Sequence, residues 1–204
     1  MHASFILFLV AALLLAMTPG PGIFYVASRT LAGGRGEGMA SVGGNALGGM
    51  VHVLAGALGV SALVMASSQA FTVLKFAGAL YLIWLGIRTF RDAKAAAALA
   101  ESATGMRKAL VDGIAVEAFN PKTAAFFLAF IPQFIDPAHG IAAQFVLLGT
   151  LSVLLNSSVD AIVVLGASRA RASLSNRPHI VRRLRQSSGV AMCGLGIGLA
   201  LAKR

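Results

Sequence analysis

Six stretches of this 204-residue chain are apolar and close to the roughly 20 residues that a helix needs to cross a lipid bilayer. Their apolar runs are continuous rather than alternating, which is typical of membrane helices and not of the strands of a membrane barrel. The pattern therefore predicts an all-α integral membrane protein with six transmembrane helices. The stretches are Ser4–Arg29, Met39–Ala66, Ala70–Phe90, Ala109–Phe134, Ile141–Ala167 and Ser187–Ala202.

The composition supports the same fold class. Hydrophobic residues make up 57% of the chain and charged residues only 12%, whereas about 25% of an ordinary soluble domain is charged. The mean hydropathy is +0.82, and a soluble domain of this size could not bury so much apolar surface. Because the connections are short, residues 1–204 are expected to form a single transmembrane domain.

The first apolar stretch is expected to stay in the protein as a membrane helix. A cleaved signal peptide carries basic residues before its apolar core, but only Met1, His2 and Ala3 precede the apolar run here. The run also continues beyond Thr18 to Val26. Both observations favour a retained helix over a cleaved leader.

The distribution of basic residues predicts the orientation in the membrane. The first, third and fifth connections hold two, five and six Lys or Arg residues, which is 13 of the 17 in the chain, and the second and fourth hold none. Lys and Arg accumulate in cytoplasmic loops. We therefore expect an inner-membrane protein with both termini outside and these three connections in the cytoplasm. The same rule accounts for the net charge of +10, so the expected partner is the lipid bilayer and not nucleic acid.

The polar stretch Arg91–Lys108 divides the chain into two halves with three apolar stretches each. We expect repeat 1 at about 1–92, a cytoplasmic connection at about 91–108 and repeat 2 at about 107–204. Because three is odd, the two halves must insert in opposite senses. This arrangement indicates an inverted 3+3 repeat, which is typical of secondary transporters.

Proline interrupts the first apolar stretch of each half. The first interruption is the Thr-Pro-Gly-Pro-Gly sequence at Thr18–Gly22, and the second is the Asn-Pro-Lys sequence at Asn120–Lys122. Proline disrupts the preceding helical turn, and carbonyl groups freed in lipid must bond to protein or to water in a cavity. A helix that restarts after the first interruption would present free N–H groups, which attract an anion such as a substrate carboxylate. The alternative explanation is a simple packing kink.

Ionisable residues inside the apolar stretches are candidates for function, because a charge at the bilayer centre costs roughly 2.5–3.5 kcal/mol on insertion scales. Lys122 lies in the fourth stretch, and Glu117, five residues earlier, is its expected partner. Asp160 lies in the fifth stretch and shares a helix face with Asn156, four residues earlier. An intramembrane carboxylate is a candidate proton carrier, so Asp160 and Glu117 compete for the proton-coupling role. A purely structural ion pair or hydrogen bond is the alternative for each.

The sequence lacks the motifs that are typical of other functional classes. The sequence contains no Gly-x-x-x-x-Gly-Lys-Ser/Thr phosphate loop and no His-Glu-x-x-His zinc motif. Cys193 is the one cysteine of the chain, which excludes an internal disulfide and a two-cysteine thiol relay. We therefore expect no enzymatic activity, no cofactor and no metal site.

Five segments carry a family resemblance, namely Met17–Pro21, Gly44–Gly48 with His52, Gly78–Gly86, Asn120–Lys122 and Phe126–Phe134. Through them the sequence resembles the LysE/RhtB family of amino acid exporters over nearly its full length. The resemblance implies export of amino acids or close derivatives, driven by a proton or ion gradient. Gly22 departs from the usual family pattern, which often has Asn at this place, and Glu117 stands where a neutral residue is commoner.

Together these features predict a secondary exporter of amino acids or close derivatives across the cytoplasmic membrane, with a proton gradient as the expected drive. The alternatives are a metal or small-cation exporter of a related family and a non-transporting membrane assembly factor. Glycines such as Gly44 and Gly48 would suit close packing within one chain or in a homo-oligomer. The expected substrate-binding residues are Thr18, Gly20, Gly22, Asn45, Asn120, Lys122 and Asn156.

Overall fold

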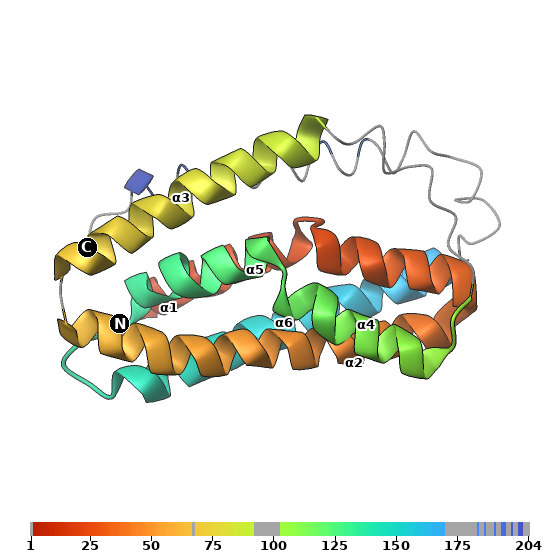
Figure 1. Cartoon of the computed structure of the whole chain (residues 1–204), viewed down its shortest axis with the longest axis horizontal. Helices are drawn as coiled ribbons and strands as arrows, with labels where there is room; N and C mark the ends of the chain where they lie inside the picture. The colour runs from red at the N-terminus through yellow and green to blue at the C-terminus, as the bar shows by residue number, and fades with distance from the viewer. Residues whose placement is uncertain are drawn as a thin grey trace.

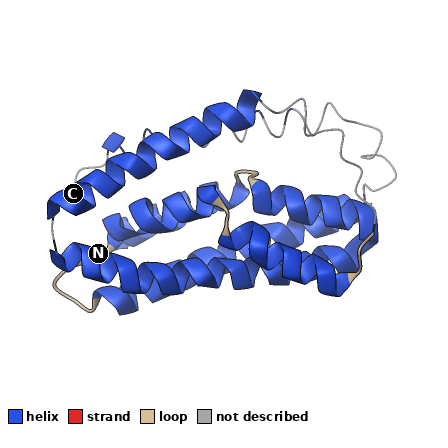
Figure 2. Cartoon of the chain, in the orientation of Figure 1, coloured by secondary structure: helices blue, strands red, loops and turns tan. Residues whose placement is uncertain are grey.

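The computed structural model is helical throughout the segments that it describes, apart from short connections (Figure 1, Figure 2). It describes residues 2–66, 68–91 and 103–169, together with Arg183, Gln186, Val190, Cys193, Gly194, Ile197, Ala200 and Leu201. The elements are α1 (His2–Met17), α2 (Pro21–Ala66), α3 (Ser68–Arg91), α4 (Met106–Ala118), α5 (Pro121–Ala125), a π-helical turn η2 (Phe126–Phe130), a 3-10 turn η3 (Ile131–Phe134) and α6 (Ile141–Arg169). Most of the sixth apolar stretch and the connection 92–102 lie outside the described residues.

Two helices in the described part are long and apolar enough to cross a membrane, Pro21–Gly59 and Ile141–Arg169. The pair Met106–Ala118 and Lys122–Phe134, bent by 44°, makes a third candidate if the two pieces form one span. Phe5–Met17 is a shorter apolar helix. Length and apolar composition therefore support an all-helical membrane protein.

The long helix α2 consists of two segments that meet at Gly34. This glycine has φ 78° and ψ −166°, a conformation that residues with a Cβ atom rarely adopt. The chain reverses direction at this point (Figure 1). The sequence predicted a connection between Arg29 and Met39, but only Gly34 leaves the helical conformation there.

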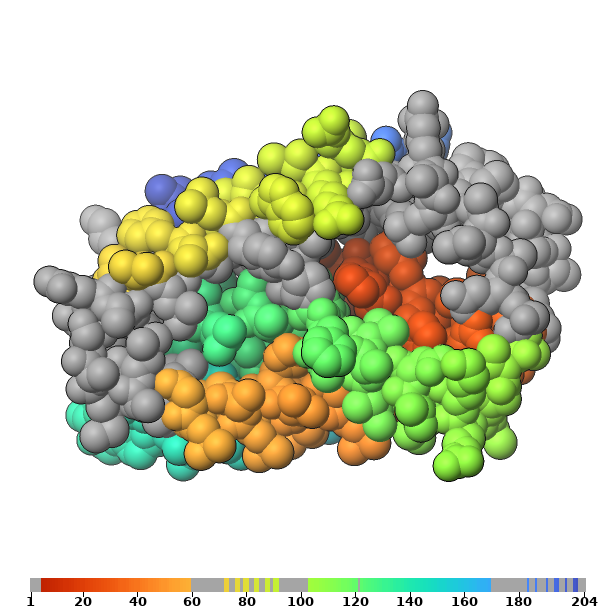
Figure 3. Space-filling model, viewed as in Figure 1, coloured from red at the N-terminus to blue at the C-terminus, as the bar shows by residue number. Residues whose placement is uncertain are grey.

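Glycines let α2 and α4 approach each other closely. A Cβ atom on Gly48 would lie 2.6 Å from the Ile114 carbonyl oxygen and 2.9 Å from the Ala118 nitrogen. A Cβ atom on Gly44 would likewise lie 3.0 Å from the Gly113 Cα. The two helices accordingly touch in the space-filling view, where this part of α2 is orange and α4 is green (Figure 3). Small residues of this kind allow backbone contact between membrane helices.

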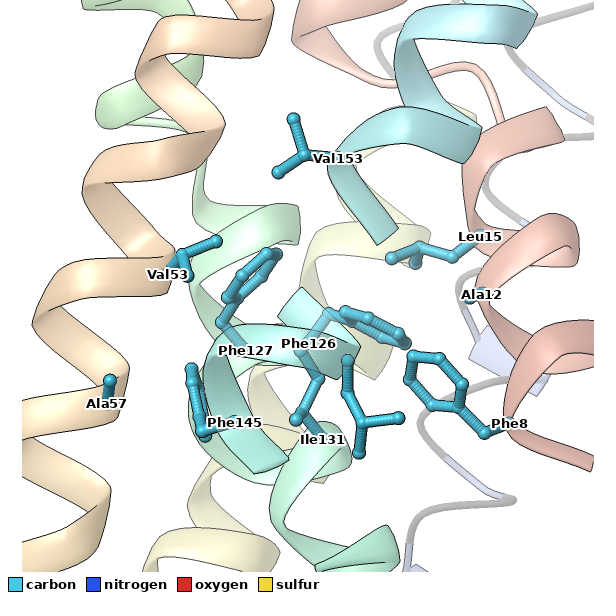
Figure 4. Packing of buried hydrophobic residues seen from close by; sticks show 11 residues of the cluster. Phe8, Ala12, Leu15, Val53, Ala57, Phe126, Phe127, Ile131, Phe145 and Val153 are labelled. Atoms are coloured by element: carbon cyan, nitrogen blue, oxygen red, sulfur yellow. The ribbon is translucent and has the colours of Figure 1, made fainter. Parts of the chain in front are cut away.

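An apolar core holds α1, α2, α6 and the irregular turns together (Figure 4). Phe8 from α1 packs edge-on against Phe134 of η3, with ring centroids 5.5 Å apart. Phe127 of η2 contacts Phe145 of α6 at 6.2 Å. Aromatic pairs at these distances add to the stabilisation from buried area, so the core fixes the η2 and η3 turns beside α1 and α6.

The connection between η3 and α6 is stabilised by hydrogen bonds among its own polar groups and to Gln144 of α6. Gln144 donates to the Asp136 carbonyl at 2.9 Å, and its side-chain oxygen accepts the Asp136 N–H at 3.0 Å. The N–H of Ala138 and the ring of His139 both bond to the Asp136 carboxylate. These bonds stabilise the charged form, so they lower the pKa of Asp136 below its ordinary value.

Because α2 and α4 are in close contact, a glycine-to-alanine substitution should destabilise the protein at this contact but not elsewhere in α2. Gly48→Ala should destabilise the protein by about 1–3 kcal/mol, because the Cβ atom would collide with the α4 backbone. Gly59→Ala, in the same helix but with no atom of the described residues within 4 Å of the added carbon, is the matched control and should not destabilise. Thermal unfolding in detergent measures both, and an equal effect of the two changes would contradict this packing.

Candidate functional site

The first interruption of the helices lies at residues 18–20. Helix α1 ends at Met17 and α2 begins at Pro21, while the Thr18 hydroxyl donates to the Leu14 carbonyl at 2.7 Å. In the first turn of α2, the N–H of Phe24 donates to the Gly20 carbonyl at 3.0 Å, just before the helix begins. The N–H groups that precede it in the helix, such as that of Gly22, have no acceptor in their own helix.

The second interruption lies at residues 119 and 120, between α4 and α5. Asn120 caps α5, because its side-chain oxygen accepts the N–H of Lys122 at 3.1 Å. Pro121 occupies the first turn of α5, where its missing N–H costs nothing. The chain then continues through the η2 and η3 turns, so this segment contains several departures from regular α-helix.

Lys122 connects the two interruptions. Its ammonium group donates to the Leu15 carbonyl at 3.2 Å and to the Thr18 carbonyl at 2.9 Å. These carbonyls belong to the end of α1, where the helix dipole is negative. The residue is 3% exposed, and its stem covers Gly20, on which a Cβ atom would lie 3.1 Å from Lys122 Cδ. The ammonium group therefore supplies a donor to the Thr18 carbonyl, and a second donor to the Leu15 carbonyl, which also accepts the Thr18 N–H at 3.1 Å.

Glu117 is held by neutral donors and not by Lys122, contrary to the pairing expected from the sequence. Its Oε2 accepts from Asn120 Nδ2 at 2.8 Å, and its Oε1 accepts from the Thr123 hydroxyl at 2.6 Å. Its backbone carbonyl accepts from His52 Nε2 at 2.9 Å. Both carboxylate oxygens thus have partners inside the protein. The direct pairing fails because Lys122 turns toward the end of α1, which no sequence spacing reveals.

Asn45 and Asp160 form a buried pair between α2 and α6. Asn45 Nδ2 donates to Asp160 Oδ2 at 2.9 Å, and the two residues are 6% and 4% exposed. The side-chain oxygen of Asn45 is also buried, and it has no hydrogen-bond partner in the described part of the chain. This pair therefore leaves one polar atom available for another group.

A cavity lies between these polar groups, with about 390 Å³ of empty space when the part open to the outside is counted. Binding sites for small molecules are concave and bring a few polar groups together in a mostly apolar lining. Its small and apolar lining residues are Gly22, Ile23, Ala46, Gly49, Phe127 and Val153. Its polar lining residues are Asn45, Glu117, Asn120, Lys122, Thr123, Asn156, Ser157 and Asp160.

Most candidate residues from the sequence therefore surround one cavity. Seven of the nine line it, namely Gly22, Asn45, Glu117, Asn120, Lys122, Asn156 and Asp160. Thr18 and Gly20 are not in the lining, but both contact the Lys122 side chain. Ser157 and Thr123 also line the cavity without having been singled out, although Ser157 lies next to Asn156 and Thr123 next to Lys122 in the sequence.

The family model described as LysE type translocator matches residues 13–203. The chain belongs to this family. The match includes both helix interruptions and every residue that lines the cavity. The protein is therefore a membrane transporter of the LysE family, in agreement with the resemblance seen in the sequence.

Several relatives of this LysE translocator match along almost their whole length. An uncharacterized membrane protein of Vibrio cholerae is 34% identical over 200 residues, which cover 96% of each chain. A homoserine/homoserine lactone efflux protein of Salmonella typhimurium is 32% identical, with 96% of this chain and 95% of the relative covered. A leucine efflux protein of Klebsiella pneumoniae is 28% identical, with 97% and 94% covered. No solved structure matches the chain.

The charged groups of the cavity do not resemble a metal centre. No group of three or more His, Cys, Asp or Glu side chains gathers anywhere in the described residues of this LysE translocator. Zinc and copper prefer imidazole and thiolate ligands, whereas the polar groups of the cavity lining are amides, hydroxyls, one ammonium and two carboxylates. These groups are suited to a polar organic molecule.

A second buried charge cluster was not singled out in the sequence. Arg29 and Glu37 are 3% and 5% exposed, with Arg29 Nη1 3.7 Å from Glu37 Oε2. Glu37 Oε1 accepts the N–H groups of Thr104 and Gly105 at 2.8 and 2.6 Å, just before α4. The cluster ties the region of Gly34 to the start of α4. One signal was present, since Glu37 is the only acidic residue before position 92.

The contact between Gly22 and Glu117 predicts a measurable coupling in this LysE translocator. A Cβ atom on Gly22 would lie 2.5 Å from Glu117 Oε2, so Gly22→Ala should destabilise the protein by about 1–3 kcal/mol. In a Glu117→Ala background the same change should cost at least about 1 kcal/mol less, because the obstructing carboxylate is gone. Thermal unfolding of the two single variants and the double variant measures this coupling. Strictly additive effects would show that the two residues do not share this space.

Proposed function

We propose that this protein is a secondary exporter of amino acids or close derivatives. The observation that carries the proposal is the full-length match to the LysE family together with relatives named as homoserine/homoserine lactone and leucine efflux proteins. The cavity between the helix interruptions supplies the chemistry such a substrate needs. It has carboxylate and amide groups for an ammonium, and it lies beside helix N–H groups suited to a carboxylate.

The substrate binds in this cavity, with its carboxylate near Gly22 and Ile23. Both residues line the cavity at the start of α2, where N–H groups lack acceptors in their own helix. Asn120 and Asn156 add polar contacts from the second interruption and from α6. Lys122 maintains the site by bonding the carbonyls of Leu15 and Thr18, and Gly20 gives its stem room.

The fold is an inverted repeat with three spans in each half, and the first span of each half is broken at proline. The two observed interruptions support this proposal, since they occur at Thr18–Gly20 and at Phe119–Asn120, about 100 residues apart. The count of basic residues supports an inner-membrane location with both termini outside and residues 91–108 in the cytoplasm. A cysteine placed at Ala97 in a Cys193→Ser background tests this orientation. Labelling of that cysteine by an impermeant thiol reagent outside intact cells would contradict it.

Asp160 is the proton carrier, and Glu117 is the competing candidate. Both oxygens of the Glu117 carboxylate already accept hydrogen bonds, from Asn120 and Thr123. The Glu117 carboxylate is therefore committed to contacts within the protein. Asp160 accepts one bond from Asn45 and faces the cavity, where a proton can reach it. Its charge can therefore change during transport with less disturbance of the surrounding contacts.

Transport by purified protein in vesicles tests both the substrate and the coupling. With L-homoserine or L-leucine as substrate, a pH gradient should drive movement by the wild type. Asp160→Asn should reduce gradient-driven movement to the level of protein-free vesicles, because the amide cannot titrate, and should still permit substrate exchange without a gradient. Asp112→Asn makes the same chemical change at a surface ion pair with Lys108, and it should retain full activity.

Two outcomes of this experiment would contradict the proposal at different levels. If the wild type moves no amino acid under any gradient, the proposed export function is wrong. If Asp160→Asn keeps pH-driven movement and Glu117→Gln loses it, the coupling role belongs to Glu117. Gly22→Val tests the site separately from the coupling, since its bulk should block substrate binding. Thermal unfolding of this variant is measured alongside, because a Cβ atom at this position also approaches Glu117 Oε2.

A further inference from the structure

The side-chain oxygen of Asn45, a residue that lines the cavity, is an unused acceptor among the described residues. Asn45 lines the cavity and is 6% exposed, yet its oxygen has no hydrogen-bond partner among the described residues. Buried polar groups are nearly always bonded, and an exception calls for an explanation such as a missing ligand. The environment of Asn45 indicates which kind of hydrogen-bond donor would bind to this oxygen.

The neighbouring carboxylate fixes the orientation of the Asn45 amide. An ionised carboxylate can only accept hydrogen bonds, so the Asn45 group that faces Asp160 Oδ2 at 2.9 Å must be the NH₂ group. The oxygen is thereby left for another donor. The negative charge of Asp160, beside the amide, favours a donor that is positively charged.

We propose that the Asn45 side-chain oxygen binds the primary ammonium group of the substrate, and that ionised Asp160 orients this amide. This subsite rests on the proposed function and makes it specific, because it identifies the ammonium group as the part of the amino acid that the cavity requires. A compound that keeps the ammonium group and lacks the carboxylate should therefore still bind. A compound with a blocked amine should not.

The other charged groups around the cavity are already committed to partners within the protein. On α4, Glu117 accepts bonds from Asn120 and Thr123. On α5, Lys122 donates to carbonyls at the end of α1. On α2, His52 Nε2 bonds to the Glu117 carbonyl. Of the charged groups around the cavity, this leaves Asp160, paired with Asn45, as the one best able to attract an ammonium.

Protonation of Asp160 would change what Asn45 offers to the substrate. A protonated carboxyl group has an O–H donor, which can bond to the Asn45 oxygen once the amide rotates. The amide would then present its NH₂ group to the cavity and lose its attraction for an ammonium. Proton uptake at Asp160 would thus release the substrate, which is the relation that proton-coupled export requires.

Ligand binding to the purified protein in detergent tests the subsite, with the shift of the thermal unfolding midpoint as the measure of affinity. The probes are L-homoserine, L-homoserine lactone, which keeps the amine and lacks the carboxylate, and N-acetyl-L-homoserine, which keeps the carboxylate and lacks the amine. At about pH 6, homoserine and its lactone should bind, and the N-acetyl compound should bind at least about ten-fold more weakly. Equal binding of the lactone and the N-acetyl compound to the wild type would overturn the subsite without any variant being needed.

A nearly isosteric substitution removes the proposed acceptor. Asn45→Leu should weaken binding of homoserine and of its lactone by about ten-fold or more, the effect of losing a hydrogen bond to a charged group. Gln133→Leu makes the matched change at an amide outside the cavity, whose nitrogen donates a long bond of 3.3 Å to the Ala129 carbonyl, and should leave binding unchanged. Unchanged affinity in a folded Asn45→Leu protein would overturn the proposal.

The orienting role of Asp160 has its own readout in the pH dependence. Wild-type affinity for homoserine should rise with pH as Asp160 loses its proton, because only the ionised carboxylate keeps the Asn45 oxygen free for the substrate. Asp160→Asn still offers an acceptor to Asn45, so binding should persist and its pH dependence should disappear, whereas Asp112→Asn should keep the wild-type profile. A wild-type profile in Asp160→Asn would overturn the orienting role.

If none of the three probes binds the wild type, the subsite and the proposed function are both overturned, whereas equal binding of all three overturns the subsite alone.

Discussion

The hydrogen bonds from the Lys122 ammonium group to the Leu15 and Thr18 carbonyls are the contact on which the rest of the site depends. Carbonyls freed by a broken helix cannot remain unbonded in lipid, and an unpaired lysine there is equally unfavourable. Each interruption therefore supplies what the other lacks. These bonds span more than 100 residues of sequence and join the end of α1 to α5, whose Lys122 lines the cavity.

The two buried carboxylates, Glu117 and Asp160, differ in how completely they are hydrogen-bonded within the protein. Glu117 has a bonded partner on each oxygen, and its carboxylate occupies the space that a side chain on Gly22 would need. It therefore contributes mainly to the architecture of the cavity. Among the described residues, Asp160 has one hydrogen-bond partner, the Asn45 side chain, and it can change its charge with less disturbance. In the cavity, Glu117 thus has fixed hydrogen bonds, whereas the Asn45–Asp160 pair can change its charge. A carrier that binds and releases its substrate requires such a changeable group.

The sequence predicted the parts of this site that depend on local chemistry. Prolines set the positions at which α2 and α5 begin, because proline cannot continue a helix, and polar residues in apolar stretches are rare enough to be conspicuous. The partners of these residues were less predictable. Lys122 bonds to α1 and not to Glu117, and Glu37 bonds to the start of α4, because these contacts depend on how distant helices approach each other. The roles of the cavity residues in binding and coupling remain predictions.

Protection of a cavity residue by substrate tests the central claim most directly, namely that the cavity between the interruptions holds the amino acid. In a Cys193→Ser background, a single cysteine replaces Ala46 in the cavity lining, and a control cysteine replaces the exposed Ala143 at the start of α6. In vesicles that transport L-homoserine or L-leucine, the substrate should slow labelling of the Ala46 cysteine by a small thiol reagent and leave the Ala143 cysteine unaffected. Equal labelling of the Ala46 cysteine with and without a substrate that the same vesicles transport would contradict the account.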